Sequence, residues 1–112
     1  MKNIAILTCL KASEVCTGAS CLESFFKRQH AFANYDEELN LKAFWHCNGC
    51  EKNPNSCQGL NEKIERLKKI GVTHIHVGIC AFGEKYACKI MDEIIDMLKE
   101  RGFQVVLGTH KC

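Results

Sequence analysis

Short apolar runs alternate with amphipathic segments along the chain. Four runs are rich in aliphatic and aromatic residues and predict β-strands: Asn3 to Thr8, Leu39 to Trp45, Val72 to Ile79 and Phe103 to Leu107. Their near-continuous apolar character is typical of strands that are buried on both faces of a sheet. The pattern therefore predicts a sheet with helices on either side.

Three segments between the strands predict helices. Ser20 and Glu23 have the spacing of a capping box and precede a helix from about Cys21 to Ala33. A second helix from Leu60 to Gly71 places its apolar residues on one face, and a third from about Glu84 to Arg101 carries a wide apolar stripe. A glycine closes each of the last two, as is common at helix ends.

The predicted order is βαβαβαβ, and strands that alternate with helices form parallel sheets with right-handed crossovers. We therefore expect an α/β fold, a three-layer sandwich whose four-stranded parallel sheet has the flavodoxin-like order 2-1-3-4. This order places a topological switch point between the first and third strands. With 112 residues, the chain has room for one domain, so residues 1–112 are expected to form a single α/β domain.

Charge excludes several partners. Lys and Arg number 15 against 13 Asp and Glu, and the charges are interspersed along the chain. No basic patch for nucleic acid or for a membrane surface is predicted.

The first residues resemble neither an export signal nor a membrane span, so we expect a cytoplasmic protein. Neither a G-x-x-x-x-G-K-S/T loop nor a G-x-G-x-x-G motif occurs, which leaves nucleotide binding without support.

Cysteine is the unusual component of the sequence. The chain contains nine cysteines, roughly 8% of its residues and a level typical of secreted disulfide scaffolds. Their number is odd, and no export signal accompanies them. In a reducing compartment thiols stay reduced, so the composition favours metal binding or thiol catalysis over a disulfide framework.

The cysteines follow the ends of the predicted strands. Cys9 follows the first strand, Cys47 and Cys50 the second, Cys80 the third, and His110 the fourth. All strands of a parallel sheet end at one edge, so these residues are expected to come together there. The following loops and helix starts add Cys16, Cys21 and Cys88 to the same edge. Helix N-termini also crowd this edge, and their partial positive charge lowers the pKa of a nearby thiol.

Zinc takes four Cys or His ligands in a tetrahedron, and a Cys-x-x-Cys turn such as residues 47–50 presents two sulfurs to one ion. We therefore predict that the partner of this chain is a metal ion, and zinc is the first candidate. The first candidate ligands are Cys9, Cys47, Cys50 and Cys80. The further candidates are Cys16, Cys21, Cys88 and His110. The same thiolates suit an iron–sulfur cluster, which remains an alternative.

These motifs resemble those of the CGGC-domain family of small prokaryotic proteins, and the resemblance spans nearly the whole chain. It rests on the opening strand into Cys9, the CTGASC segment of Cys16 and Cys21, the CNGC box of Cys47 to Cys50, the HVGIC segment ending at Cys80, Cys88, and the GTH that ends at His110. Asn48 replaces the first glycine of the naming motif and leaves both sulfurs in place, whereas Cys57 and Cys112 have no counterpart. The resemblance implies metal binding and names neither substrate nor reaction.

Two histidines are expected to be structural. His74 and His76 alternate with apolar residues in the third strand and share one face, so hydrogen-bonded core roles are favoured over ligation, while His46 could orient the Cys-x-x-Cys turn. Three functions stay open: a metal-binding module, a thiol redox enzyme in which Cys47 attacks and Cys50 resolves, and a structural zinc protein that recognises a protein partner of unknown identity.

Overall fold

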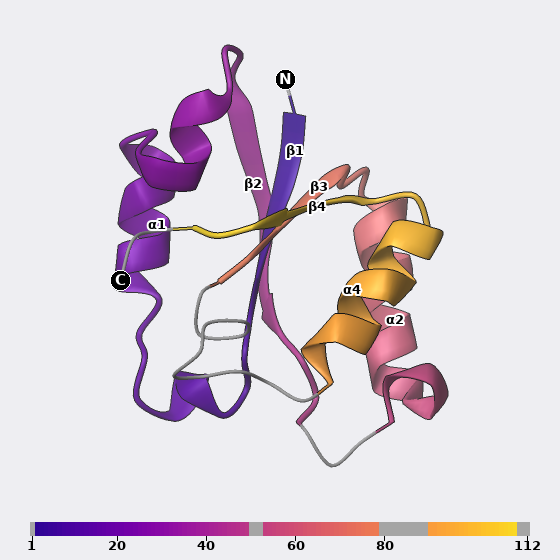
Figure 1. The fold of residues 1–112 in the computed structure, drawn as a ribbon. Helices are drawn as coiled ribbons and strands as arrows, with labels where there is room; N and C mark the ends of the chain where they lie inside the picture. Colours follow the sequence, from indigo (N-terminus) through magenta and orange to yellow (C-terminus); the bar gives the residue numbers. More distant parts are fainter. Residues whose placement is uncertain (1, 50–52, 79–89, 110–112) are drawn as a thin grey trace.

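The computed structural model describes residues 2–49, 53–78 and 90–109, which form a parallel sheet between two helical layers (Figure 1). Its strands are β1 (Lys2–Thr8), β2 (Leu39–His46), β3 (His74–Val77) and β4 (Gln104–Leu107). They lie in the order β2-β1-β3-β4, and every pair is parallel. The predicted α/β fold and the strand order 2-1-3-4 are confirmed.

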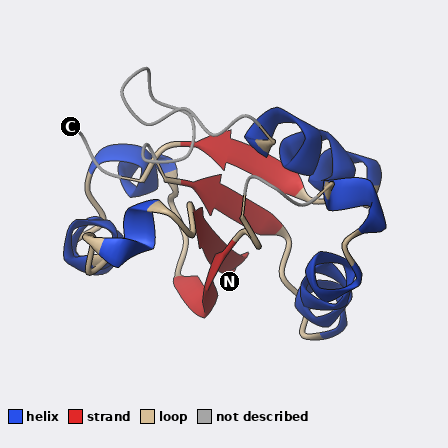
Figure 2. Cartoon of the chain, turned by 90° about the horizontal axis from the view of Figure 1, so that it is seen from below, coloured by secondary structure: helices blue, strands red, loops and turns tan. Residues whose placement is uncertain are grey.

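Helices cover both faces of the sheet, as Figure 2 shows from below. The α1 face carries α1 (Ala19–Phe26) and the 3-10 helix η2 (His30–Asn34), and the α2/α4 face carries α2 (Gln58–Lys69) and α4 (Met91–Glu100). Of two short 3-10 helices, η1 (Ala12–Glu14) follows β1 and η3 (Pro54–Ser56) precedes α2.

Each face has its own apolar core because successive strand residues point to opposite sides. On β1, Ile4 and Ile6 belong to the α1 cluster, where they pack with Phe25 and Phe32. The alternate residues of β1 belong to the α2/α4 cluster, together with apolar residues of α2, β3 and α4. Burial on both faces explains why β1 is nearly continuous in apolar residues.

A β-bulge in β2 decides which face the end of that strand occupies. The register between β1 and β2 shifts at Lys42, which has no opposite residue on β1. Before the bulge, Leu39 and Leu41 pack on the α1 face. After it, Trp45 and Cys47 pack on the α2/α4 face. Strict alternation without the extra residue would turn Cys47 to the other side.

The first helix differs from its prediction. The expected helix from Cys21 to Ala33 is divided into α1 and η2, because the backbone of Arg28 takes a left-handed φ of 54° between them. The guanidinium of Arg28 donates to the carbonyl oxygen of Tyr35 at 2.8 Å and holds this bend. The predicted capping box is also wrong: Gly18 is the N-cap, and Ser20 lies inside α1.

The other elements agree more closely with the sequence pattern. α2 buries Leu60, Ile64 and Leu67 on one face and is followed by Gly71, which has a φ of +87°. β3 begins two residues later than predicted. The start of the third predicted helix, residues 84–89, lies outside the described residues. Within the described part of the chain, no helix is long and apolar enough to cross a membrane.

Candidate thiol site at the carboxyl edge of the sheet

Neighbouring strands bring two cysteines to the carboxyl edge of the sheet. Thr8 lies opposite His46 at the ends of β1 and β2, and the next residues are Cys9 and Cys47. The N–H of Cys47 donates to the carbonyl oxygen of Thr8 at 3.2 Å and extends the ladder. Both cysteines have free thiols, are 4% and 1% exposed, and belong to the α2/α4 cluster.

A backbone N–H contacts one of these buried sulfurs. The backbone N–H of Leu10 donates to Sγ of Cys47 at 3.3 Å, and such a contact stabilises a thiolate more than a thiol. Trp45 lies in the same cluster, and its buried indole N–H has no hydrogen-bond partner among the described residues. An unsatisfied buried donor costs about 1–3 kcal/mol. The sulfur of Cys47 thus already accepts a hydrogen bond from the backbone.

A lysine of α2 organises the loop that follows Cys47. Nζ of Lys63 donates to the carbonyl oxygen of His46 at 2.8 Å and to Oδ1 of Asn48 at 2.6 Å. Nδ2 of Asn48 donates in turn to Sγ of Cys57 at 3.4 Å. Cys57 is the N-cap of α2 and packs against the α2/α4 cluster. Lys63 therefore holds the start of this loop, and Asn48 links it to Cys57.

A hollow of about 340 Å³ opens beside Cys9. Its lining residues come from the end of β1, the loop before α1 and the end of β2: Thr8, Cys9, Ala12, Cys16, Thr17, Gly18, Phe44 and His46. Cys16 is exposed, and its sulfur accepts a hydrogen bond from the N–H of Gly18 at 3.4 Å. The ring of His46 is held by its Nδ1, which lies 2.7 Å from the hydroxyl of Thr8.

Cys21 occupies the other side of the sheet. It lies in the first turn of α1, is buried in the α1 cluster, and its sulfur lies 3.1 Å from the hydroxyl of Thr109 after β4. Of the three buried cysteines in the described part of the chain, Cys9 and Cys47 therefore lie on one face of the sheet and Cys21 on the other.

Comparison with known protein families identifies this chain. The CGGC domain matches residues 3–110, nearly the whole chain. The chain belongs to the CGGC domain family. Neither a curated protein nor a solved structure matches it. Within the Cys-x-x-Cys segment at residues 47–50, the side chain of Asn48 contacts Lys63 and Cys57, which glycine could not do.

His76 of the CGGC domain is a hydrogen-bonded core residue, as predicted. Its Nδ1 lies 2.9 Å from the carbonyl oxygen of Gly108, which can only accept, so this nitrogen carries the proton. Nε2 then accepts from the hydroxyl of Tyr35 at 2.6 Å, and Phe32 stacks on the ring. Burial lowers the pKa of His76, and the bond to Gly108 opposes this effect. The ring is therefore neutral and structural.

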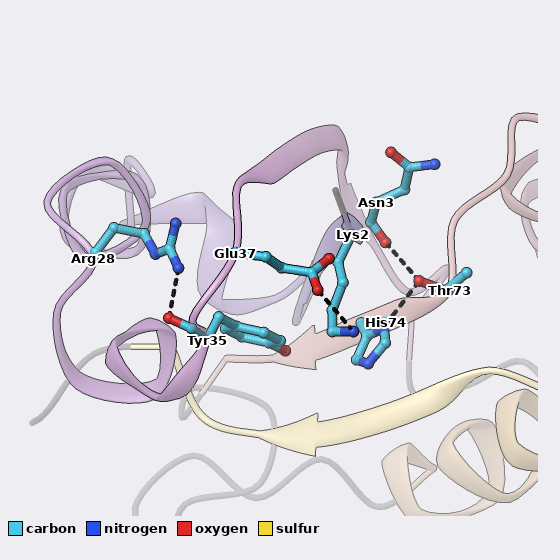
Figure 3. A network of polar contacts seen from close by, with 7 residues as sticks. All are labelled: Lys2, Asn3, Arg28, Tyr35, Glu37, Thr73 and His74. Atoms are coloured by element: carbon cyan, nitrogen blue, oxygen red, sulfur yellow. Dashed lines mark hydrogen bonds and ion pairs between the residues drawn. The ribbon is translucent and has the colours of Figure 1, made fainter.

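His74 takes part in a polar network at the opposite, amino-terminal edge of the sheet (Figure 3). Its Nδ1 lies 2.8 Å from the hydroxyl of Thr73, which also donates to the carbonyl oxygen of Asn3 at 3.4 Å. Lys2 and Glu37 form an ion pair of 3.6 Å beside it. Burial and the charge of Lys2 lower the pKa of His74. This network ties strands together at the edge away from Cys9 and Cys47.

Four of the eight predicted ligands lie outside the described residues: Cys50, Cys80, Cys88 and His110. Among the residues that are described, no three or more His, Cys, Asp or Glu side chains lie close enough together to hold a metal. The assignment of ligands in this CGGC domain thus stays a prediction.

Sequence reasoning missed Lys63 and the N–H of Leu10. A lysine in an amphipathic helix is usually a solvated residue, and a backbone donor leaves no trace in the sequence. The contact of Cys57 with Asn48 was missed as well. Its only indication was the position of Cys57 just before the apolar pattern of α2, where a helix N-terminus is expected.

Proposed function

We propose that this CGGC domain binds zinc through thiolates at the carboxyl edge of the sheet, on its α2/α4 face. Cys9 and Cys47 supply two ligands, and we assign the other two to Cys50 and Cys80, which lie outside the described residues. The observation that carries the proposal is the burial of two free thiols in one cluster at the ends of paired strands, with a backbone N–H directed at one sulfur.

The donors fit zinc by their chemistry. Thiolate is a soft ligand that favours zinc or an iron–sulfur cluster over calcium or magnesium. The N–H of Leu10 would offset part of the charge that a deprotonated Cys47 carries. A bound zinc ion would join the loops that follow β1 and β2 as a cross-link. The proposal requires reduced thiols and hence a reducing compartment such as the cytoplasm.

Elemental analysis of protein purified without oxygen tests the proposal. We expect about one zinc ion per chain and a colourless solution, since one tetrahedral site uses four ligands. Cys9→Ser and Cys47→Ser should each lose the zinc. Cys21→Ser should keep it, because this equally buried cysteine lies on the other face of the sheet.

Other outcomes would contradict zinc binding. Iron together with visible sulfide-to-iron absorption bands would make the site an iron–sulfur cluster. Metal-free protein with a reducible disulfide between Cys47 and Cys50 would indicate a thiol redox protein instead. Loss of zinc from Cys21→Ser, with the fold intact by circular dichroism, would place the site across both faces of the sheet.

A further inference from the structure

Cys9 lies where the buried α2/α4 cluster meets the hollow. Its side chain belongs to the α2/α4 cluster together with Cys47, and it also lines the hollow that opens between the β1–α1 loop and β2. Cys9 is only 4% exposed, so an ion needs an opening in the surface to reach it. The hollow is such an opening beside this buried residue.

Two more soft donors line the same hollow. Cys16 is exposed, has a free thiol, and accepts a hydrogen bond from the N–H of Gly18. Gly18 packs so closely on Phe44 that a Cβ there would lie 2.7 Å from the ring, which keeps the loop against β2. His46 has its Nδ1 held by Thr8, and its Nε2 has no partner among the described residues.

The dimensions suit a visiting ion better than a resident one. Six waters occupy about 180 Å³ at their share of liquid volume, so a hydrated ion fits into a hollow of about 340 Å³. The described donors do not form a ready-made group of three or more around one point. The hollow can therefore admit an ion with its waters and offer it ligands one at a time.

We propose that this hollow is the route by which zinc reaches the buried thiols, with Cys16 as its first, transient ligand. The inference rests on the zinc site proposed above. An incoming ion exchanges one water for the sulfur of Cys16, whose proton passes to solvent. The bond to His46 then replaces the bond to Cys16, which takes up a proton again. The bond to Cys9, whose proton passes to solvent, replaces the bond to His46. Zinc stays divalent throughout, and each new bond to zinc replaces one that breaks.

Zinc transfer from a weak coloured chelator to metal-free protein, followed by stopped-flow absorbance, tests this route. Cys16→Ser should slow the transfer severalfold, because a serine hydroxyl is a much weaker ligand for zinc than a thiolate. Its final zinc content and its affinity at equilibrium should equal those of the wild type. Circular dichroism checks that the variant is folded.

A second pair of variants tests the hollow without touching a sulfur. Thr17 is exposed and lines the hollow. Thr17→Trp should fill the opening and slow transfer, whereas Thr17→Val, which has nearly the shape of threonine, should load at the rate of the wild type. Both variants should bind zinc with unchanged final affinity.

The outcomes separate this inference from the proposed function. If the wild type takes up no zinc, both are wrong. If Cys9→Ser loses zinc but Cys16→Ser and Thr17→Trp load at the rate of the wild type, the zinc site stands and the route is wrong. If Cys16→Ser binds zinc more weakly at equilibrium, Cys16 is a permanent ligand, which also overturns the transient role.

Discussion

His76 joins parts of the chain that are far apart in the sequence. Its two nitrogens contact Gly108 after β4 and Tyr35 after η2, and its ring stacks on Phe32 at 4.3 Å between centroids. Gly108 is followed by Thr109, whose hydroxyl contacts the thiol of Cys21. A neutral imidazole thus holds the end of β4 against the α1 face.

We predict that His76 makes the protein less stable in acid. Burial lowers its pKa in the folded state, while the unfolded chain keeps a value near 6.5. Between these two values the unfolded chain binds more protons, so the free energy of unfolding falls as the pH falls. The contribution of His76 is therefore complete above the unfolded pKa and is lost as the pH drops toward the folded one.

The variant His76→Asn checks this prediction because asparagine can still donate to Gly108 and does not titrate. At about pH 7.5 the wild type should have a larger free energy of unfolding than the variant, and this difference should shrink toward about pH 5. Urea unfolding at each pH measures it. A difference that stays constant with pH would show that the pKa of His76 is the same in the folded and unfolded states.

At the scale of elements, the helix α2 fixes the loop that follows β2. Lys63 of α2 reaches back to the carbonyl oxygen of His46 and to Asn48, and Asn48 reaches Cys57 at the N-cap of the same helix. The loop is therefore fastened at both ends to one rigid element. Glycine at position 48 would leave Lys63 with only the carbonyl contact.

We predict that Lys63→Met weakens zinc binding by about tenfold, the lower end of the effect of outer-shell partners on metal affinity. Methionine keeps the length of the side chain but removes both hydrogen bonds that hold the loop after Cys47. A competition titration with a chelator of known affinity measures the change. Lys69→Met is the matched control, since Lys69 is exposed at the end of α2. Equal affinities of the two variants would contradict the prediction.

Single elements were predictable to different degrees. The bounds of β1 and β2 agree with the sequence to within about one residue because their apolar runs end at polar residues or cysteine. α1 was predicted too long, because the left-handed φ of Arg28 depends on a contact with Tyr35 seven residues away. The bulge at Lys42 was not predicted, since it depends on pairing with β1.

At the scale of the whole molecule, the proposed zinc site is part of the larger apolar core. Cys9 and Cys47 pack in the same cluster as the buried residues of α2 and α4. A zinc ion that binds only the folded state would therefore stabilise this core as well as the loops.

We predict that zinc raises the melting temperature by roughly 10 °C at a free concentration about 100 times its dissociation constant. That excess contributes about 2.7 kcal/mol, and each kcal/mol shifts the transition of a domain of this size by about 4 °C. Calorimetry with zinc and with a chelator measures the shift. Cys47→Ser should show no shift, and an equal shift in this variant would place zinc elsewhere.

The sequence by itself determined the α/β class, the strand order and the presence of cysteines at strand ends. These follow from the local pattern of apolar residues and from general rules of parallel sheets, neither of which needs a particular tertiary contact. Only the tertiary structure decided which face each described cysteine occupies. That choice depends on the register between β1 and β2, on the bulge at Lys42 and on the packing of α1, all of which arise from residues distant in the chain.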